Sequence, residues 1–270
     1  MNRNYKLLLL LIIIVSSFNS GFTQVNSNEE LSTNEHLVLA TAWYQKSAEM
    51  RACYYQAYQL AKIKLDDHLA KHAGNKPTAV IFDIDETLLD NSPFEVHLIK
   101  TGEVYTKDTW NEWTQKAEAK ALPGALEFTQ YVQSRGVELF YISNRKINEM
   151  ENTLNNLKAE NFPFADSIHL LLRSLNQNSD KTGRRNQVLH SFDVLLYVGD
   201  NLTDFSEDFA HRGTDLGFPL VDSLYKQFGD KYIILPNPMY GEWENALYGN
   251  DFGLSEPKKR ALRKDVLLGY

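Results

Sequence analysis

Asp83 and Asp85 stand two residues apart, directly after the apolar segment 79–82. A β-favouring run that ends in two carboxylates is typical of a buried strand that delivers acids to the edge of a parallel sheet. In extended backbone the two side chains project to one side of the strand. Two like charges there repel each other, and a divalent cation or a retained proton relieves the repulsion. The pattern therefore predicts an active site at this edge.

Two further apolar segments also end in polar residues. Ser143 follows residues 137–142, and Asp200 and Asp204 follow residues 194–198. If these segments are neighbouring strands of one parallel sheet, their polar ends meet in a single pocket.

Such a pocket suits phosphoryl transfer. The carboxylate of Asp83 can attack phosphorus and form an aspartyl-phosphate. Because acids alone would repel a phosphate dianion, we expect Mg²⁺ to be held by Asp83 and Asp200. Lys181 and the hydroxyl of Ser143 would stabilise charge on the transferring oxygens. Asp85 is the natural general acid, because a carboxyl beside another carboxylate can retain a proton.

The elements that would position these residues alternate between strands and helices. We expect strands at residues 79–82, 137–142, 168–172, 194–198 and 232–235. The alternation predicts an α/β fold, a doubly wound parallel sheet with a smaller helical flanking or cap region built from the N-terminal and C-terminal segments.

One long helical stretch is expected at residues 35–72, which contain neither Gly nor Pro. Leu39, Leu60 and Ile63 are among the apolar residues that recur there at helical intervals, and they predict the face that packs on the sheet. Cys53 lies in the same stretch and is expected to be packed.

The chain divides into four expected segments. These are a signal peptide at 1–24, an N-terminal helical segment at 25–75, a catalytic core with inserted cap elements at 76–235, and a C-terminal segment at 236–270 that completes the cap and the substrate pocket. The signal peptide is expected from basic residues, a short apolar run at 7–15 and a small-residue exit, with cleavage between Ser20 and Gln24. It predicts export to the periplasm or the medium, with association with the cell surface as a further alternative.

Charge and cysteine content exclude several classes of protein. The 270 residues carry a formal net charge of −7 and no basic stripe, which argues against a nucleic-acid polymer as partner. The single cysteine excludes an intramolecular disulfide framework and a multi-cysteine metal site.

These residues together resemble a known family. Residues 82–87, 143–145, Lys181 and 199–204 look like the four motifs of the haloacid dehalogenase (HAD) superfamily, in its four-aspartate phosphatase form. Residues 42–52, 56–58, 89–93 and 236–244 are similar to the class C acid phosphatases, the bacterial lipoprotein e family. The resemblance covers essentially the whole chain after the signal peptide.

The resemblance implies a Mg²⁺-dependent acid phosphatase and 5'-nucleotidase that acts on nucleoside monophosphates and other small phosphomonoesters outside the cytoplasm. It makes Asp83 the nucleophile, and Asp85 the acid and base whose backbone carbonyl also binds Mg²⁺. Asp200 would be the remaining protein ligand, and Asp204 would hold a metal-bound water or orient Lys181.

Substrate contacts also follow from the resemblance. Trp110 and Tyr240 resemble the aromatic residues that flank the base or ring of the substrate, and Asn144 and Arg145 complete the motif of Ser143. Many members carry a lipid on a cysteine after the signal peptide. None follows it here, so no lipid anchor is expected.

The alternative is a non-catalytic extracytoplasmic binding protein for a nucleotide-like or haem-like ligand, with Trp110 and Tyr240 as a stacking platform. A degenerate binding relative would be expected to lose an essential acid. All four are present, which favours catalysis.

Overall fold

The structure is a computed structural model that describes residues 34–210, 212–251 and 253–270. The predicted signal peptide and its cleavage site lie outside these residues. Within the part that is described, no helix is both long enough and apolar enough to span a bilayer.

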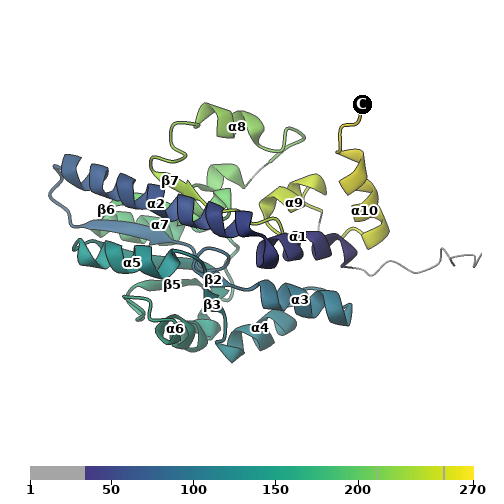
Figure 1. The fold of residues 1–270 in the computed structure, drawn as a ribbon, viewed down its shortest axis with the longest axis horizontal. Coiled ribbons are helices and arrows are strands. Elements are labelled where there is room, and N and C mark those ends of the chain that lie inside the picture. Colours follow the sequence, from purple (N-terminus) through teal and green to yellow (C-terminus); the bar gives the residue numbers. More distant parts are fainter. Residues whose placement is uncertain (1–33, 211, 252) are drawn as a thin grey trace, which may run out of the picture. The chain divides into compact units, whose positions relative to one another are not determined.

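Helices and strands alternate through most of the chain (Figure 1). The strands are β1 (Thr78–Phe82), β2 (Leu89–Asp90), β3 (Lys120–Ala121), β4 (Glu138–Lys146), β5 (Leu170–Arg173), β6 (Asp193–Gly199) and β7 (Tyr232–Ile234). The helices are α1 (Glu35–Lys46), α2 (Ala48–Lys71), α3 (Ser92–Thr101), α4 (Lys107–Lys116), α5 (Ala125–Ser134), α6 (Met150–Ala159), α7 (Thr182–Ser191), α8 (Phe218–Ser223), α9 (Glu242–Leu247) and α10 (Glu256–Asp265), with 3₁₀ turns η1 (Ile147–Glu149), η2 (Leu202–Asp204) and η3 (Glu207–Phe209).

The main sheet of the described residues has five parallel strands in the order β5-β4-β1-β6-β7. β1 lies in the middle, where Phe82 pairs with Tyr141 of β4 and Val198 of β6. The predicted parallel α/β fold is therefore confirmed. Because β4 and β6 are the two neighbours of β1, the polar residues that end these three strands meet at one edge.

The two faces of the sheet bury alternate residues of each strand. Val80 and Phe82 pack with residues of α2, α5 and α6, whereas Ala79 and Ile81 pack with residues of α7, α8 and the η3 turn. Since the side chains of a strand alternate between faces, nearly continuous apolar runs are what a sheet covered on both faces requires. Figure 1 shows α2 and α5 running along the sheet.

The prediction of a single helix at 35–72 is wrong in one respect, because the segment forms two helices, α1 and α2. Ser47 has extended backbone, with φ −85° and ψ 139°, and its hydroxyl accepts a hydrogen bond from the amide of Met50 at 3.0 Å. A serine in this conformation satisfies an amide that a helix start leaves unpaired, so it ends α1 and begins α2.

The buried face of these helices differs in part from the expected one, since Leu60 packs against the main core as expected but other residues of the expected face do not. Leu39 and Ile63 are 81% and 64% exposed, and Cys53 is exposed, not packed. The buried positions of α2 include Tyr54 and Tyr58, whose rings reach the core. Tyrosine carries a polar end, so counting apolar residues alone selected the neighbouring face.

Glu95 of α3 provides a test of how this helix is packed. Its side chain is buried, and burial, together with the charge of Glu244, raises its pKa to about 7. The folded state therefore holds this proton more tightly than the unfolded chain, whose glutamates titrate near 4.5. The contribution of Glu95 to stability is complete below pH 4.5 and falls as pH rises to 7, by about 2 to 3 kcal/mol.

We expect Glu95→Gln to remove this slope and to be the more stable protein above pH 7. Guanidinium unfolding of both proteins between pH 4.5 and 8 measures it. Glu127→Gln, at an exposed position of α5, is the matched control. Parallel stability profiles for the wild type and Glu95→Gln would contradict the prediction.

Candidate active site

Three carboxylates converge where β1 and β6 end. Asp83 directly follows β1, and Asp200 and Asp204 follow β6. One carboxylate oxygen from each lies within 4.8 Å of the others. Asp83 and Asp204 are buried, and Asp200 is partly exposed. The structure thus brings together three of the four predicted aspartates in an all-oxygen group that could hold a metal ion.

Lys181 lies between two of these acids. It immediately precedes α7, is 4% exposed, and donates hydrogen bonds to Asp83 and, at 2.6 Å, to Asp204 Oδ1. Asp204 thus contacts Lys181 directly, as one of its two expected roles requires. The sequence predicts Lys181 in a loop. In the folded chain it contacts Asp83 at the end of β1, although the two residues are 98 positions apart in the sequence.

The electrostatics of this group are those of crowded, buried acids. Burial, together with the charges of Asp204 and Asp85, outweighs the effect of Lys181 and raises the pKa of Asp83 to about 7. Burial also raises the pKa of Asp200, with Asp204 and Asp83 adding to it. Burial by itself would lower the pKa of Lys181, but the charges and hydrogen bonds of Asp204 and Asp83 have the larger effect and raise it to about 12.

The turn after β6 is built around Gly199. A Cβ added to Gly199 would lie 2.3 Å from Oδ2 of Asp204, so no side chain fits there. The same Oδ2 accepts a hydrogen bond from the amide of Asn201 at 2.9 Å, which closes the η2 turn over the glycine. The Gly-Asp-x-x-x-Asp spacing is therefore a packing requirement of the acid cluster.

Two residues to which the sequence assigned no role support Asp200. Asn237 donates to its Oδ2 at 2.9 Å, and the hydroxyl of Thr87 lies 3.4 Å from its Oδ1. Asn237 belongs to the segment 236–244, whose resemblance to the class C acid phosphatases was its signal in the sequence. Thr87 closes the motif of Asp83 and Asp85 and carried no separate signal.

Helix α2 anchors the loop that follows β1. The hydroxyl of Tyr54 donates to the carbonyl of Glu86 at 2.5 Å, and that of Tyr58 donates to the carbonyl of Thr87 at 2.6 Å. Glu86 needs this anchoring, because its backbone has the left-handed φ of 56° that side chains rarely adopt. Its fully buried carboxyl accepts from the amide of Asn91 at 2.7 Å, and burial raises its pKa.

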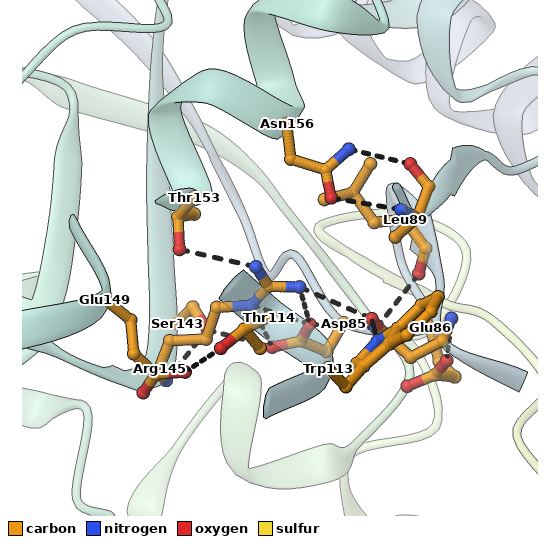
Figure 2. A network of polar contacts seen from close by, with 12 residues as sticks. Asp85, Glu86, Leu89, Trp113, Thr114, Ser143, Arg145, Glu149, Thr153 and Asn156 are labelled. Carbon is orange, nitrogen blue, oxygen red and sulfur yellow. Dashed lines mark hydrogen bonds and ion pairs between the residues drawn. The ribbon is translucent and has the colours of Figure 1, made fainter. Parts of the chain in front are cut away.

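The carboxylate of Asp85 contacts residues of β4. Its Oδ1 accepts hydrogen bonds from Nε and Nη2 of Arg145, at 3.0 and 2.7 Å, and its Oδ2 lies 3.1 Å from the hydroxyl of Ser143 (Figure 2). Its side chain is 18% exposed. Although Asp85 is two residues from Asp83, the chain leaves β1 after Phe82, and the two carboxylates have different partners.

Ser143, Asn144 and Arg145 all lie within β4, which is longer than expected. Ser143 is fully buried, and its hydroxyl also accepts the amide of Arg145. Asn144 Oδ1 accepts from Nη2 of Arg184 at 2.8 Å, and Arg184 also binds the carbonyl of Ser143. Arg184 is a site residue that sequence reasoning missed, since it is one of three cations in the segment 181–185.

Trp110 and Tyr240 are both partly buried. Trp110 lies on α4, where its ring packs edge-on against Phe94 at 5.2 Å and lies 5.7 Å from the guanidinium carbon of Arg145. Tyr240 packs against the main core after β7. The structure therefore places Trp110 beside the Asp85 network, and it leaves the substrate contacts of both aromatic residues as predictions.

The chain is similar to known proteins over most of its length. The family described as HAD superfamily, subfamily IIIB (acid phosphatase) matches residues 15–243. A crystal structure of the class C acid phosphatase from Bacillus anthracis with tungstate bound is 42% identical, with a TM-score of 0.83. That similarity covers 88% of this chain and 98% of the other.

Two plant proteins are more distant relatives. The stem 31 kDa glycoprotein of Glycine max is 30% identical over 149 residues, 54% of this chain and 58% of that protein. Acid phosphatase 1 of Solanum lycopersicum is 30% identical over 166 residues, 59% of this chain and 57% of that protein. The chain thus spans less than two thirds of the length of these curated relatives.

Proposed function

The chain belongs to the subfamily IIIB acid phosphatases of the HAD superfamily, and on this premise we propose that it hydrolyses phosphomonoesters, nucleoside monophosphates among them, through an aspartyl-phosphate on Asp83. The observation that carries the proposal is the buried group of Asp83, Asp200 and Asp204 with Lys181 among them. The Bacillus anthracis relative supports the substrate class, because tungstate is a tetrahedral oxyanion like phosphate.

In the first step, Asp83 attacks phosphorus while the bond to the leaving oxygen breaks, and Asp85 supplies the proton that this oxygen takes up. In the second step, water attacks phosphorus while the bond from phosphorus to the Asp83 oxygen breaks, and Asp85 takes a proton from the water, so inorganic phosphate is released and the free carboxylate of Asp83 is restored. Lys181 keeps Asp83 oriented and offsets part of the negative charge of the site.

The residues of the site fit Mg²⁺. Three carboxylates and one ammonium group leave an excess of negative charge at the cluster, and hard oxygen donors are the ligands that Mg²⁺ prefers. Asp83, Asp200 and the backbone carbonyl of Asp85 would hold the ion, and Asp204 would orient Lys181. When bound, the ion would supply positive charge to the phosphoryl oxygens.

Export is part of the proposal. It rests on the basic, apolar and small-residue segments within residues 1–24. Fractionation of a bacterium expressing the full chain, followed by phosphatase assay of the medium, periplasm and cytoplasm, tests it, and activity confined to the cytoplasm would contradict it.

Metal removal should abolish activity. We expect EDTA to lower phosphate release from a nucleoside monophosphate by about 100-fold or more, because several kcal/mol of transition-state stabilisation would be lost. Excess Mg²⁺ should restore the activity, and Ca²⁺ should restore less because it favours larger, looser coordination. Circular dichroism in EDTA checks that the protein remains folded. Full activity in EDTA would contradict the proposed metal site.

A further inference from the structure

The guanidinium group of Arg145 is locked in place around Asp85. Two of its nitrogens contact the carboxylate, and the third, Nη1, lies 3.3 Å from the hydroxyl of Thr153 on α6 (Figure 2). Its side chain is 1% exposed. A planar fork that is bound on both sides and closed to water cannot turn, so it fixes the plane of the carboxylate that it binds.

Asn91 adds a second constraint on the same carboxylate. Its Nδ2 donates to Asp85 Oδ1 at 2.9 Å, and its Oδ1 accepts from Nε1 of Trp113 at 2.8 Å and from Nη2 of Arg145 at 3.4 Å. Indole and guanidinium groups can only donate, so they hold the amide oxygen of Asn91 toward themselves and its NH₂ group toward Asp85. Asn91 is 1% exposed, which leaves water no access to compete.

Helix α4 carries both Trp113 and Trp110. Residues three apart lie on one side of a helix, and here one tryptophan binds Asn91 while the other lies over the guanidinium of Arg145. The helix is fixed from the next position, where the hydroxyl of Thr114 donates to Glu149 at 2.8 Å. Glu149 in turn accepts from the amide of Lys146 at the end of β4.

From this geometry, and resting on the function proposed above, we propose that Arg145, Asn91 and Trp113 are positioning residues for the proton transfer by Asp85, and that α4 links them to the leaving group. The side of α4 that would contact the leaving group through Trp110 also holds the Asp85 carboxyl through Asn91. The network thus aligns Asp85 with the oxygen that departs as the phosphorus–oxygen bond breaks, when that oxygen keeps the bonding electrons and takes the proton.

The proposal makes activity depend on the basicity of the leaving oxygen. Benzyl phosphate releases a strongly basic alkoxide that needs a proton, whereas 4-nitrophenyl phosphate releases a stable phenolate that needs little help. Both substrates present an aromatic ring to Trp110, so they differ chiefly in their demand on Asp85. The constant kcat/KM reports the first phosphoryl transfer, before the water step that the two substrates share.

The experiment measures kcat/KM for both substrates with the wild type, three variants of the network and one control variant, in Mg²⁺. Arg145→Lys keeps the charge but loses the fork, and Trp113→Phe removes one hydrogen bond but keeps a ring. We expect losses on benzyl phosphate of about 100-fold and about 10-fold, and losses on 4-nitrophenyl phosphate below about 3-fold. Asp85→Asn should also lose more activity on benzyl phosphate than on 4-nitrophenyl phosphate, and the difference should be larger than in the other two variants. Arg263→Lys, in an ion pair with Glu256, is the matched control and should change neither substrate.

The outcomes separate the two proposals. Equal losses on both substrates in Arg145→Lys and Trp113→Phe, while Asp85→Asn discriminates, would overturn the positioning role and leave the proposed function standing. The proposed function would instead be overturned if Asp85→Asn lowered kcat/KM equally for the two substrates, or if the wild type hydrolysed neither of them. If Arg145→Lys does not fold, Trp113→Phe alone decides, because it leaves the buried charge pair in place.

Discussion

Asp83→Asn should lower kcat for every phosphomonoester by at least about 10⁴-fold, because an amide cannot attack phosphorus and no covalent intermediate forms. The protein should remain folded. The substitution replaces one of three crowded carboxylates by a neutral group of the same shape, and burial had already raised the pKa of Asp83 to about 7. Rapid acid quenching with radiolabelled substrate should trap a phosphoryl-enzyme in the wild type and none in the variant.

Asp222→Asn is the matched control for this variant. Asp222 is an exposed residue of α8. The Asp222→Asn protein should therefore show the same activity and the same amount of trapped phosphoryl-enzyme as the wild type. A folded Asp83→Asn protein that still turns over substrate would remove Asp83 from the role of nucleophile, and with it the proposed two-step mechanism.

Lys181→Met should cost both activity and stability. The variant keeps the length of the side chain but leaves Asp83 and Asp204 without their shared ammonium partner. Removing one partner of a buried ion pair costs about 3 to 5 kcal/mol, and we expect a loss of activity on the order of 10³-fold because the site that must accept a phosphate becomes more negative.

The stability loss in Lys181→Met should depend on pH in one direction. Lys181 lowers the pKa of Asp83 against the effect of burial, so its removal raises that pKa further above the value in the unfolded chain. A carboxyl group whose pKa is raised in the folded state destabilises that state at a pH where the unfolded chain ionises it. It no longer does so at a pH where the group is protonated in both states. The loss should therefore be largest above pH 7 and shrink as pH falls toward 4.

Guanidinium unfolding in EDTA, at pH 5 and pH 8, measures this dependence. Lys158→Met, at an exposed position of α6, supplies the control for loss of a lysine as such. A Lys181→Met protein that is as stable as the wild type at pH 8 would show that the pair with Asp83 and Asp204 contributes nothing to the fold.

The sequence by itself determined where the chemistry starts. Apolar runs that end in acids predicted β1 and β6, and their alternation with helices predicted a parallel sheet whose strand ends meet. These inferences succeed because burial and the repeat of side chains along a strand are local properties, visible over five or six residues. The order of the four motifs then pointed to the family that the comparisons support.

The partner of each acid follows from the tertiary structure alone. Asp83 and Asp85 are only two residues apart, yet one contacts Lys181 and the other contacts Arg145, 60 residues away. Asn237 reaches Asp200 from a segment beyond the last strand. Such partners depend on strand order and on the paths of loops, and no local pattern of residues encodes either.

The same reason explains the error in the N-terminal helices. An apolar stripe predicts a face, but the face that packs is the one whose polar ends find partners. Tyr54 and Tyr58 bury their rings because the carbonyls of Glu86 and Thr87 are there to accept their hydroxyls, and those carbonyls lie in the loop that carries Asp83 and Asp85. The sequence thus determined the acids and their strands, and the tertiary structure determined which partners each acid meets, because buried polar groups are stable only where partners from distant segments meet them.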